Sequence, residues 1–285
     1  MLVPPQSILT SGLQAPGAAF SALKFILMDE LPPMPAAPRP TPTTSLAARL
    51  LNVFATPGEV FDEVKTTPST PANWLVPTLL SAVVGVLASL LIFSQPAIVQ
   101  QLHEQQAKAI DQQVKAGTMT QADADKALPM IEKFTGPAML KIFGSVGAVV
   151  GSFIRLFWWA FVLWLAAKLF LKVDLSYLKV AEAAGLATMI SLLGGIVALL
   201  LTVNLGKLFS SPSLALAVSD FDAQKKSHLL LGAANVFSFW FIGVLSSGLS
   251  RLAGVPFGRA MFLVLTYWLF QELLLIFSGL GQMAL

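Results

Sequence analysis

Cysteine is absent from the 285-residue chain, so disulfides, thiolate nucleophiles and cysteine-ligated metal sites are excluded. Histidine occurs only at His103 and His228, and neither has a partner at metal-binding spacing. A Gly-x-Ser-x-Gly elbow, a P-loop and a Gly-x-Gly-x-x-Gly segment are also missing. These absences predict a protein that is not an enzyme and that uses no metal or cofactor.

Charged side chains are scarce as well. They make up 12% of the chain, whereas about 25% is usual for a soluble domain. Because 55% of the residues are hydrophobic and the mean hydropathy is +0.74, lipid must be the solvent for much of the surface. The net charge of +3 is spread over many loops rather than gathered in a basic run, which argues against a nucleic-acid partner.

Long apolar stretches are abundant, and each can cross a hydrocarbon core that needs about 20 helical residues. The candidate spans are Trp74 to Phe93, Gly144 to Leu171, Val180 to Val203, Leu229 to Ser250 and Met261 to Leu280. We therefore predict an all-α integral membrane protein, with five transmembrane helices in a membrane domain over residues 74–281.

The first 45 residues have a different composition. Nine of the 18 prolines fall between Pro4 and Pro42, and each removes a backbone donor and fixes φ. Residues 1–45 are expected to form a disordered, Pro-rich tail that acts either as a tether or as a ligand for a proline-reading domain. Met28 directly precedes the densest proline stretch, and we expect it to be the natural start.

Two short helices are predicted between this tail and the first span, over residues 46–73. Ser45 can cap the first helix, and Thr56-Pro57-Gly58 separates it from the second. Both pieces are too short to span a membrane. We expect them either to lie in the cytoplasmic interface or to form a cap packed over the helix bundle.

A polar insert over residues 97–136 reads as a helical hairpin outside the membrane. Apolar residues recur at helical spacing in both halves, Gly117 can end the first helix, and Thr120 can cap the second. The charges of the insert balance. It is either a solvated protrusion or a docking site for a partner protein.

Positive charge is densest in two short turns between spans. Lys168, Lys172 and Lys179 fall between spans two and three, and Arg251 and Arg259 between spans four and five. Such turns belong in the cytoplasm. We expect a multi-pass protein of a bacterial inner membrane, with its N terminus in the cytoplasm and its C terminus outside.

Two ionisable residues lie deep in predicted spans, where charge is costly. Arg155 lies 13 residues before Lys168, and Glu272 lies 13 residues after Arg259. Both are therefore about 20 Å from the cytoplasmic side, at 1.5 Å per residue. We predict that they pair in the bundle interior, as a structural ion pair or as a proton or ion relay; snorkelling of each side chain is the remaining alternative.

Small residues at helical spacing predict close helix contacts in spans two and four, within one chain or in a homo-oligomer. They are Gly144, Gly147, Ala148, Gly151 and Ser152, with Gly243 and Ser247. Asn235 and Gln271 are candidates for interhelical hydrogen bonds. Trp158, Trp159 and Trp164 lie inside span two rather than at its ends. They are expected either to face lipid or pack against other helices, or to surround a pocket for a lipid or a quinone.

The order of these elements resembles the prokaryotic branch of the Yip (Ypt-interacting protein) membrane family. The likeness runs over residues 46–281 and includes Leu51-Asn52-Val53-Phe54-Ala55-Thr56-Pro57-Gly58-Glu59-Val60-Phe61. The tryptophan-rich span ending Lys168-Leu169-Phe170-Leu171 and the segment Asn235-Val236-Phe237-Ser238-Phe239-Trp240 also resemble it.

The resemblance implies five spans, a cytosolic N terminus, and no catalytic residues. Eukaryotic relatives act in vesicle traffic and bind prenylated Rab-type GTPases, but the Asp-Leu-Tyr-Gly-Pro motif of those relatives is missing, since the only tyrosines are Tyr177 and Tyr267. The polar hairpin is extra relative to their pattern. The family supports a scaffold or adaptor.

Our first interpretation is thus a non-enzymatic membrane scaffold or adaptor that organises other membrane or peripheral proteins in the lipid bilayer. The alternative is a small transporter or channel that uses Arg155 and Glu272. An intramembrane enzyme ranks third because no set of nucleophile, base and metal is visible.

The charge pattern predicts the outcome of a fusion experiment. Alkaline phosphatase attached at the C terminus should be active, because the fifth span would carry it out of the cytoplasm. The activity of colonies on a chromogenic phosphate ester measures this. An inactive C-terminal fusion, together with an active one in the turn near Arg259, would invert the predicted topology.

Overall fold

The computed structural model describes residues 44–219 and 221–278. The proline-rich stretch up to residue 43 and the expected start at Met28 lie outside these residues. Within them, five helices have the length and composition of membrane spans, as predicted. They are α4 (Ala72–Ile92), α7 (Pro137–Ala166) with its π-helical extension η1 (Ala167–Leu171), α8 (Tyr177–Leu205), α10 (Val236–Ala253) and α11 (Phe257–Ser278).

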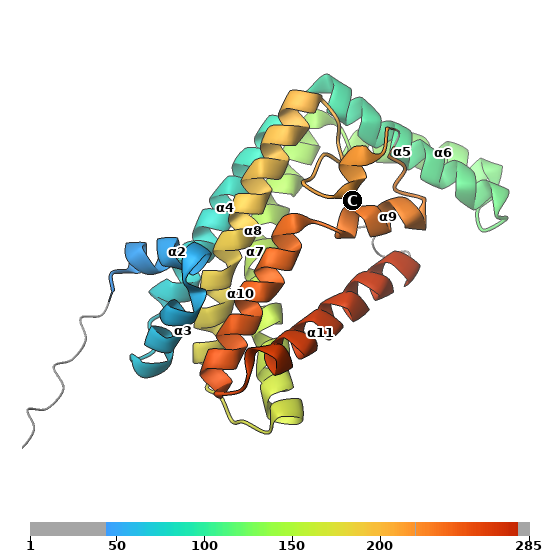
Figure 1. Ribbon diagram of the computed structural model, residues 1–285. Helices are drawn as coiled ribbons and strands as arrows, with labels where there is room; N and C mark the ends of the chain where they lie inside the picture. The colour runs from blue at the N-terminus through green and yellow to red at the C-terminus, as the bar shows by residue number, and fades with distance from the viewer. Residues whose placement is uncertain (1–43, 220, 279–285) are drawn as a thin grey trace, which may run out of the picture. The chain divides into compact units, whose positions relative to one another are not determined.

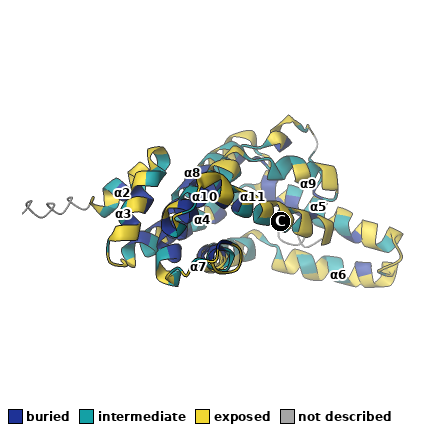
Figure 2. Cartoon of the chain, turned by 60° about the horizontal axis from the view of Figure 1, so that its bottom comes forward, coloured by how far each residue is buried: buried dark blue, intermediate teal, exposed yellow. Residues whose placement is uncertain are grey.

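Helices α4, α7, α8 and α10 run side by side, whereas α11 turns back beside α10 and diverges from the bundle (Figure 1). Helix α4 packs mainly on α7 and α8, and α10 packs on α8 and α11. Viewed from another side, buried residues gather on α8 and α10, and the outer helix faces are exposed (Figure 2). That distribution suits a bundle whose outer surface meets lipid.

The contact between α4 and α8 is closest at Gly185. A Cβ there would lie 2.3 Å from the Trp74 Cα and 3.0 Å from the Asn73 carbonyl oxygen. Two real carbon atoms do not approach to that distance, so the two helices can cross here only because residue 185 has no side chain. Gly185 was not among the small residues predicted to make close helix contacts.

The small residues that were predicted to make contacts divide into two rows. Gly144 lies against Ser89 and Phe93 of α4, and Ala148 lies against Gly85. Gly147, Gly151 and Gly243 have open space where a Cβ would be, so they make no such contact. In α10 the close approach is made instead by Gly248, which faces Ala183 and Phe61. The close contacts of Gly144, Ala148 and Gly248 are therefore with α4, α8 and Phe61.

Span four begins later than predicted. Residues 229–233 belong to a separate helix, α9 (Lys226–Ala233), and α10 starts at Val236. Asn235 causes the break, because its side chain accepts a hydrogen bond from the Phe237 backbone N–H at 2.9 Å and caps α10. Its backbone also bridges Ser213 in the preceding loop. The interhelical role that we expected for Asn235 is therefore wrong.

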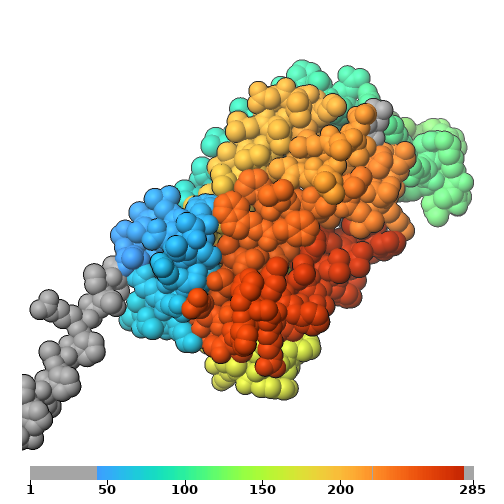
Figure 3. Space-filling model, viewed as in Figure 1, coloured from blue at the N-terminus to red at the C-terminus, as the bar shows by residue number. Residues whose placement is uncertain are grey.

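The two short helices near the N terminus are α2 (Leu46–Ala55) and α3 (Pro57–Thr66), and we call this pair the cap. Ser45 caps α2 by accepting a hydrogen bond from the Ala48 N–H at 3.2 Å. Val53, Phe61 and Val64 are fully buried in one core with α7, α8 and α10. In the space-filling view the cap and the bundle form one continuous surface (Figure 3). The two short helices therefore pack on the bundle through one apolar face.

The polar insert is a helical hairpin of α5 (Pro96–Lys115) and α6 (Gln121–Phe134). Gly117 turns the chain with φ +72°, and Thr120 caps α6 through the Asp123 N–H. At the base, His103 hydrogen-bonds Thr135. Gln101 of α5 also holds the loop after α8 through Gly206 and Leu208, while the rest of the hairpin projects away from the bundle (Figure 1).

Gly185→Ala should destabilise the protein by about 1–3 kcal/mol, the cost of forcing a methyl group into a packed contact. Gly195→Ala, ten residues later on α8, is the matched control because nothing lies within 4 Å of its added Cβ. It should be neutral or slightly stabilising, since alanine favours helix over glycine. Thermal unfolding in detergent measures both. Equal melting temperatures would contradict the close crossing of α4 and α8.

Candidate functional site

A buried polar network lies where the cap meets the bundle. Glu182, in the second turn of α8, is 1% exposed, and Asn73, in the first turn of α4, is 0% exposed. The Asn73 amide Nδ2 donates to Glu182 Oε2 at 2.6 Å. The Thr70 backbone N–H donates to the other carboxylate oxygen at 3.2 Å. The carboxylate thus joins α8 to the start of α4.

The network continues into the cap through Arg49, which is 7% exposed. Its guanidinium donates to Asn73 Oδ1 at 3.2 Å and to Glu63 Oε1 at 2.9 Å. Asn73 therefore accepts from one charged side chain and donates to another. Removing one side chain of such a network leaves its partners buried without a hydrogen bond, which costs folding free energy.

Lys179 ties the end of α3 to the same place. Its ammonium donates to the Val64 and Thr67 carbonyls at 2.6 and 2.5 Å and lies 3.6 Å from Glu182 Oε1. These carbonyls stand at the C-terminal end of α3, where a cation is favoured by the helix dipole. At its other side α3 meets the last turn of α10, through an exposed pair of Asp62 with Arg251 at 3.0 Å.

This network was not predicted from the sequence. Glu182 lies inside the stretch that we assigned to span three. As an ionisable residue within a predicted span, it indicated a special position as strongly as Arg155 and Glu272 did. Arg49 was not singled out, because an arginine among leucines in a short helix suggests a surface position. Only the tertiary contact with Asn73, 24 residues away, shows that it is buried.

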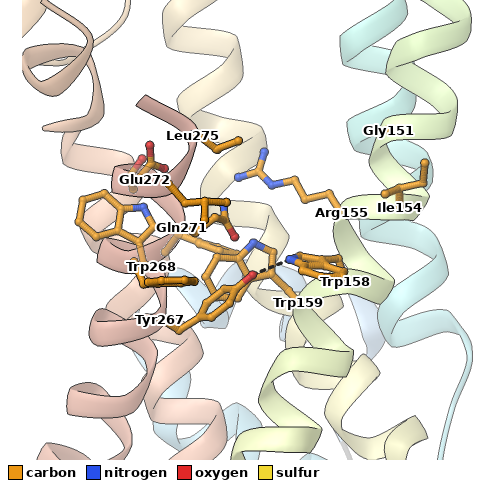
Figure 4. A pocket seen from close by; sticks show the side chains of 14 residues that line it. Gly151, Ile154, Arg155, Trp158, Trp159, Tyr267, Trp268, Gln271, Glu272 and Leu275 are labelled. Carbon is orange, nitrogen blue, oxygen red and sulfur yellow. Dashed lines mark hydrogen bonds between the residues drawn. The ribbon is translucent and has the colours of Figure 1, made fainter. Parts of the chain in front are cut away.

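The second candidate is a cavity of about 600 Å³ between α7, α10 and α11, which we call the α7–α11 cavity. Polar and aromatic residues make up much of its wall: Arg155, Trp158 and Trp159 of α7, Ser238 and Phe241 of α10, and Tyr267, Trp268, Gln271 and Glu272 of α11 (Figure 4). This volume is typical of small-molecule sites. Both intramembrane charges that the sequence analysis singled out line this one space.

Arg155 and Glu272 do not form the direct ion pair that we expected. Among the described residues, ion pairs join Arg49 to Glu63, Lys115 to Asp111, Lys179 to Glu182 and Arg251 to Asp62. Arg155 instead donates to Ser191 Oγ of α8 at 3.0 Å and lies 5.6 Å from the centre of the Phe241 ring. Equal depth of Arg155 and Glu272 in the membrane is not sufficient for an ion pair. Helix α11 diverges from α7, and the cavity lies between the two helices.

Aromatic contacts close the lower side of the cavity as Figure 4 shows it. The Trp158 indole N–H donates to the Tyr267 hydroxyl at 2.6 Å. Trp159 meets the same tyrosine and Phe241 edge to face, with centroids 5.3 and 5.5 Å apart. Trp158 and Trp159 therefore pack against neighbouring aromatic rings and also line the cavity. Trp164 instead donates to the Leu175 carbonyl in the turn before α8.

Gln271, our other candidate for an interhelical hydrogen bond, has a buried side-chain oxygen with no hydrogen-bond partner in the part of the chain that the structure describes. No group of three or more His, Asp or Glu residues in that part is placed to hold a metal ion. The cavity thus offers one cation, one carboxylate and one unsatisfied amide oxygen among aromatic rings.

A comparison with protein families matches residues 51–280 to the Yip1 domain. The chain belongs to the Yip1 domain family. The matched region runs from the middle of α2 through α11, so the Yip1 domain contains the α7–α11 cavity and nearly all of the network beneath the cap. Neither a search of curated proteins nor one of solved structures found a match to the chain. The family is one of multi-pass membrane proteins, in agreement with the five spanning helices.

Glu63 makes the cap of this Yip1 domain sensitive to pH. Burial raises the pKa of Glu63, but hydrogen bonds from Arg49 and Thr44 lower it by more, so the pKa lies below the ordinary value of 4.5. The stabilisation of the folded protein by ionised Glu63 is then complete above pH 4.5. It is lost as the pH falls through the lower pKa that Glu63 has in the folded protein.

Melting temperatures in detergent between about pH 6 and about pH 3 measure this contribution. Glu63→Gln should be less stable than the wild type at the upper end and should lose less stability on acidification. Exposed Glu59, in the first turn of α3, supplies the control Glu59→Gln. Parallel pH curves for all three proteins would contradict the role of Glu63.

Proposed function

We propose that this Yip1-domain protein is a non-enzymatic membrane scaffold, and that the outer face of the cap binds a partner protein. The observation that carries the proposal is the buried network, which fixes two short helices on the bundle through Arg49, Asn73 and Glu182. Such helices are only marginally stable by themselves in water. A surface that is held this rigidly can bind without a large loss of conformational entropy.

The outer face of the cap has the character of a small interaction surface. Leu51 is 69% exposed, and Asn52 and Glu59 are exposed with it. The inner face of the same two helices is buried in the core. A large apolar side chain among polar ones, on a rigid support, resembles the centre and rim of a protein–protein interface.

The charge pattern supports a cytoplasmic position for this surface. Arg251 contacts Asp62 of the cap, and the Arg251 carbonyl accepts from Lys65 at 2.9 Å. Lys179 also contacts the cap. The basic turns and the cap therefore share one end of the bundle, and basic turns favour the cytoplasm. A partner would then be a cytoplasmic or peripheral membrane protein.

Site-specific photocrosslinking in native membranes tests the proposal. A photoreactive residue at Leu51 should give adducts with another protein, because this side chain is 69% exposed. The control position is Leu87 on α4, which is similarly exposed, at 51%, but lies in a membrane-spanning helix. The substitution Asn73→Ala, which cuts the network, should lower the yield at Leu51. The proposal fails if Leu51 gives the same adducts as Leu87 or if it captures only the same chain.

A further inference from the structure

The α7–α11 cavity has walls of opposite character. Arg155 supplies positive charge from α7, while Glu272 supplies negative charge and Gln271 a buried, unpartnered oxygen from α11. In Figure 4 the amide of Gln271 and the guanidinium of Arg155 face the space between the helices, and the Trp268 indole lies beside Glu272. Separated charges in a membrane are costly unless something between them compensates both.

Arg155 has donors to spare. A guanidinium carries five N–H groups in a planar fork, and among residues 44–219 and 221–278 Arg155 uses one of them in a hydrogen bond, to Ser191. This geometry suits the paired oxygens of a phosphate group. Its contact with the Phe241 ring holds the side chain toward the cavity.

The α11 wall has the chemistry that recognises an ammonium group. A carboxylate and an amide oxygen can each accept from it, and the aromatic side chains of Trp268 and Tyr267 line the same cavity. Aromatic faces attract cations, most strongly when water is excluded. A ligand that carried only a negative charge would satisfy Arg155 but leave the Gln271 oxygen unpaired and face the repulsion of Glu272.

The cavity opens toward the surface that meets lipid. Ile154, Phe270 and Leu274 belong to its wall and are 63%, 63% and 49% exposed. Exposed apolar side chains beside a charged interior match a molecule with a polar head and hydrocarbon tails. A water-soluble ligand without hydrocarbon chains would gain no binding free energy from the apolar side chains at this opening.

We propose that the α7–α11 cavity binds the headgroup of a zwitterionic phospholipid with a primary ammonium. The phosphate lies on Arg155, the ammonium on Gln271 and Glu272, and the acyl chains leave over Ile154 and Phe270. This site is independent of the scaffold function of the cap, since the two share no residue.

The test uses the full chain, purified and stripped of lipid in detergent, with binding measured by native mass spectrometry. Dioleoyl phosphatidylethanolamine should bind roughly tenfold more tightly than dioleoyl phosphatidylglycerol, which has the phosphate but no ammonium; tenfold corresponds to about 1.4 kcal/mol. Soluble phosphoethanolamine is the third probe, and it should compete poorly because it lacks the chains.

Variants assign the two ends of the site. Arg155→Leu should weaken binding of both lipids, with partial recovery in Arg155→Lys. Glu272→Gln and Gln271→Leu should remove the preference for phosphatidylethanolamine. Gln271→Leu deletes no charge, so it keeps the test informative if a charge variant fails to fold. The control Arg259→Leu removes an exposed arginine near the start of α11 and should change nothing.

Equal binding of the two lipids by the wild type would overturn the proposal. So would a preference that survives in both Glu272→Gln and Gln271→Leu. If soluble phosphoethanolamine competed as well as the lipid, the site would belong to a free zwitterion and the lipid assignment would be wrong.

Discussion

The carboxylate of Glu182 is the group on which the arrangement of the described helices depends most. It is buried where α4, α8 and the cap meet, and its two oxygens accept from Asn73 and Thr70. A buried carboxylate without hydrogen-bond partners would be costly, so Asn73 and Thr70 must lie next to Glu182 in the folded protein. Gly185, one turn later, lets the backbones come close enough for the Asn73 bond to form. Charge and close packing therefore fix the same contact.

The two candidate sites differ in how their charges are compensated. Beneath the cap each charged group reaches a partner in the protein, as Arg49 reaches Glu63 and Lys179 reaches Glu182, and Nε of Arg49 is the buried donor of this network that has no partner among the described residues. In the α7–α11 cavity Arg155 and Glu272 belong to opposite walls and do not pair with each other. Charged groups that are paired in the protein hold helices in place, while unpaired ones supply affinity for something else. The first arrangement serves architecture, and the second serves binding.

Much of the fold could be predicted from the sequence because hydrocarbon imposes simple rules. Span number follows from apolar length, and the hairpin follows from local signals at Gly117 and Thr120. The predictions that went wrong depended on tertiary direction. Asn235 was read as part of a span because the apolar run continues on both sides of it, and the pairing of Arg155 with Glu272 assumed that α11 stays parallel to α7. Contacts such as Asn73 with Glu182, 109 residues apart, leave no local pattern.

The small share of α11 in the core has a consequence for biosynthesis. Only Ala260 and Val264 represent this helix among the buried members of the central cluster, whose other members come from the cap, α7, η1, α8 and α10. Those segments all precede Phe257 in the chain, so most of the buried cluster can pack before α11 joins it. Helix α11 would then add Ala260 and Val264 to a cluster that the earlier helices have already formed.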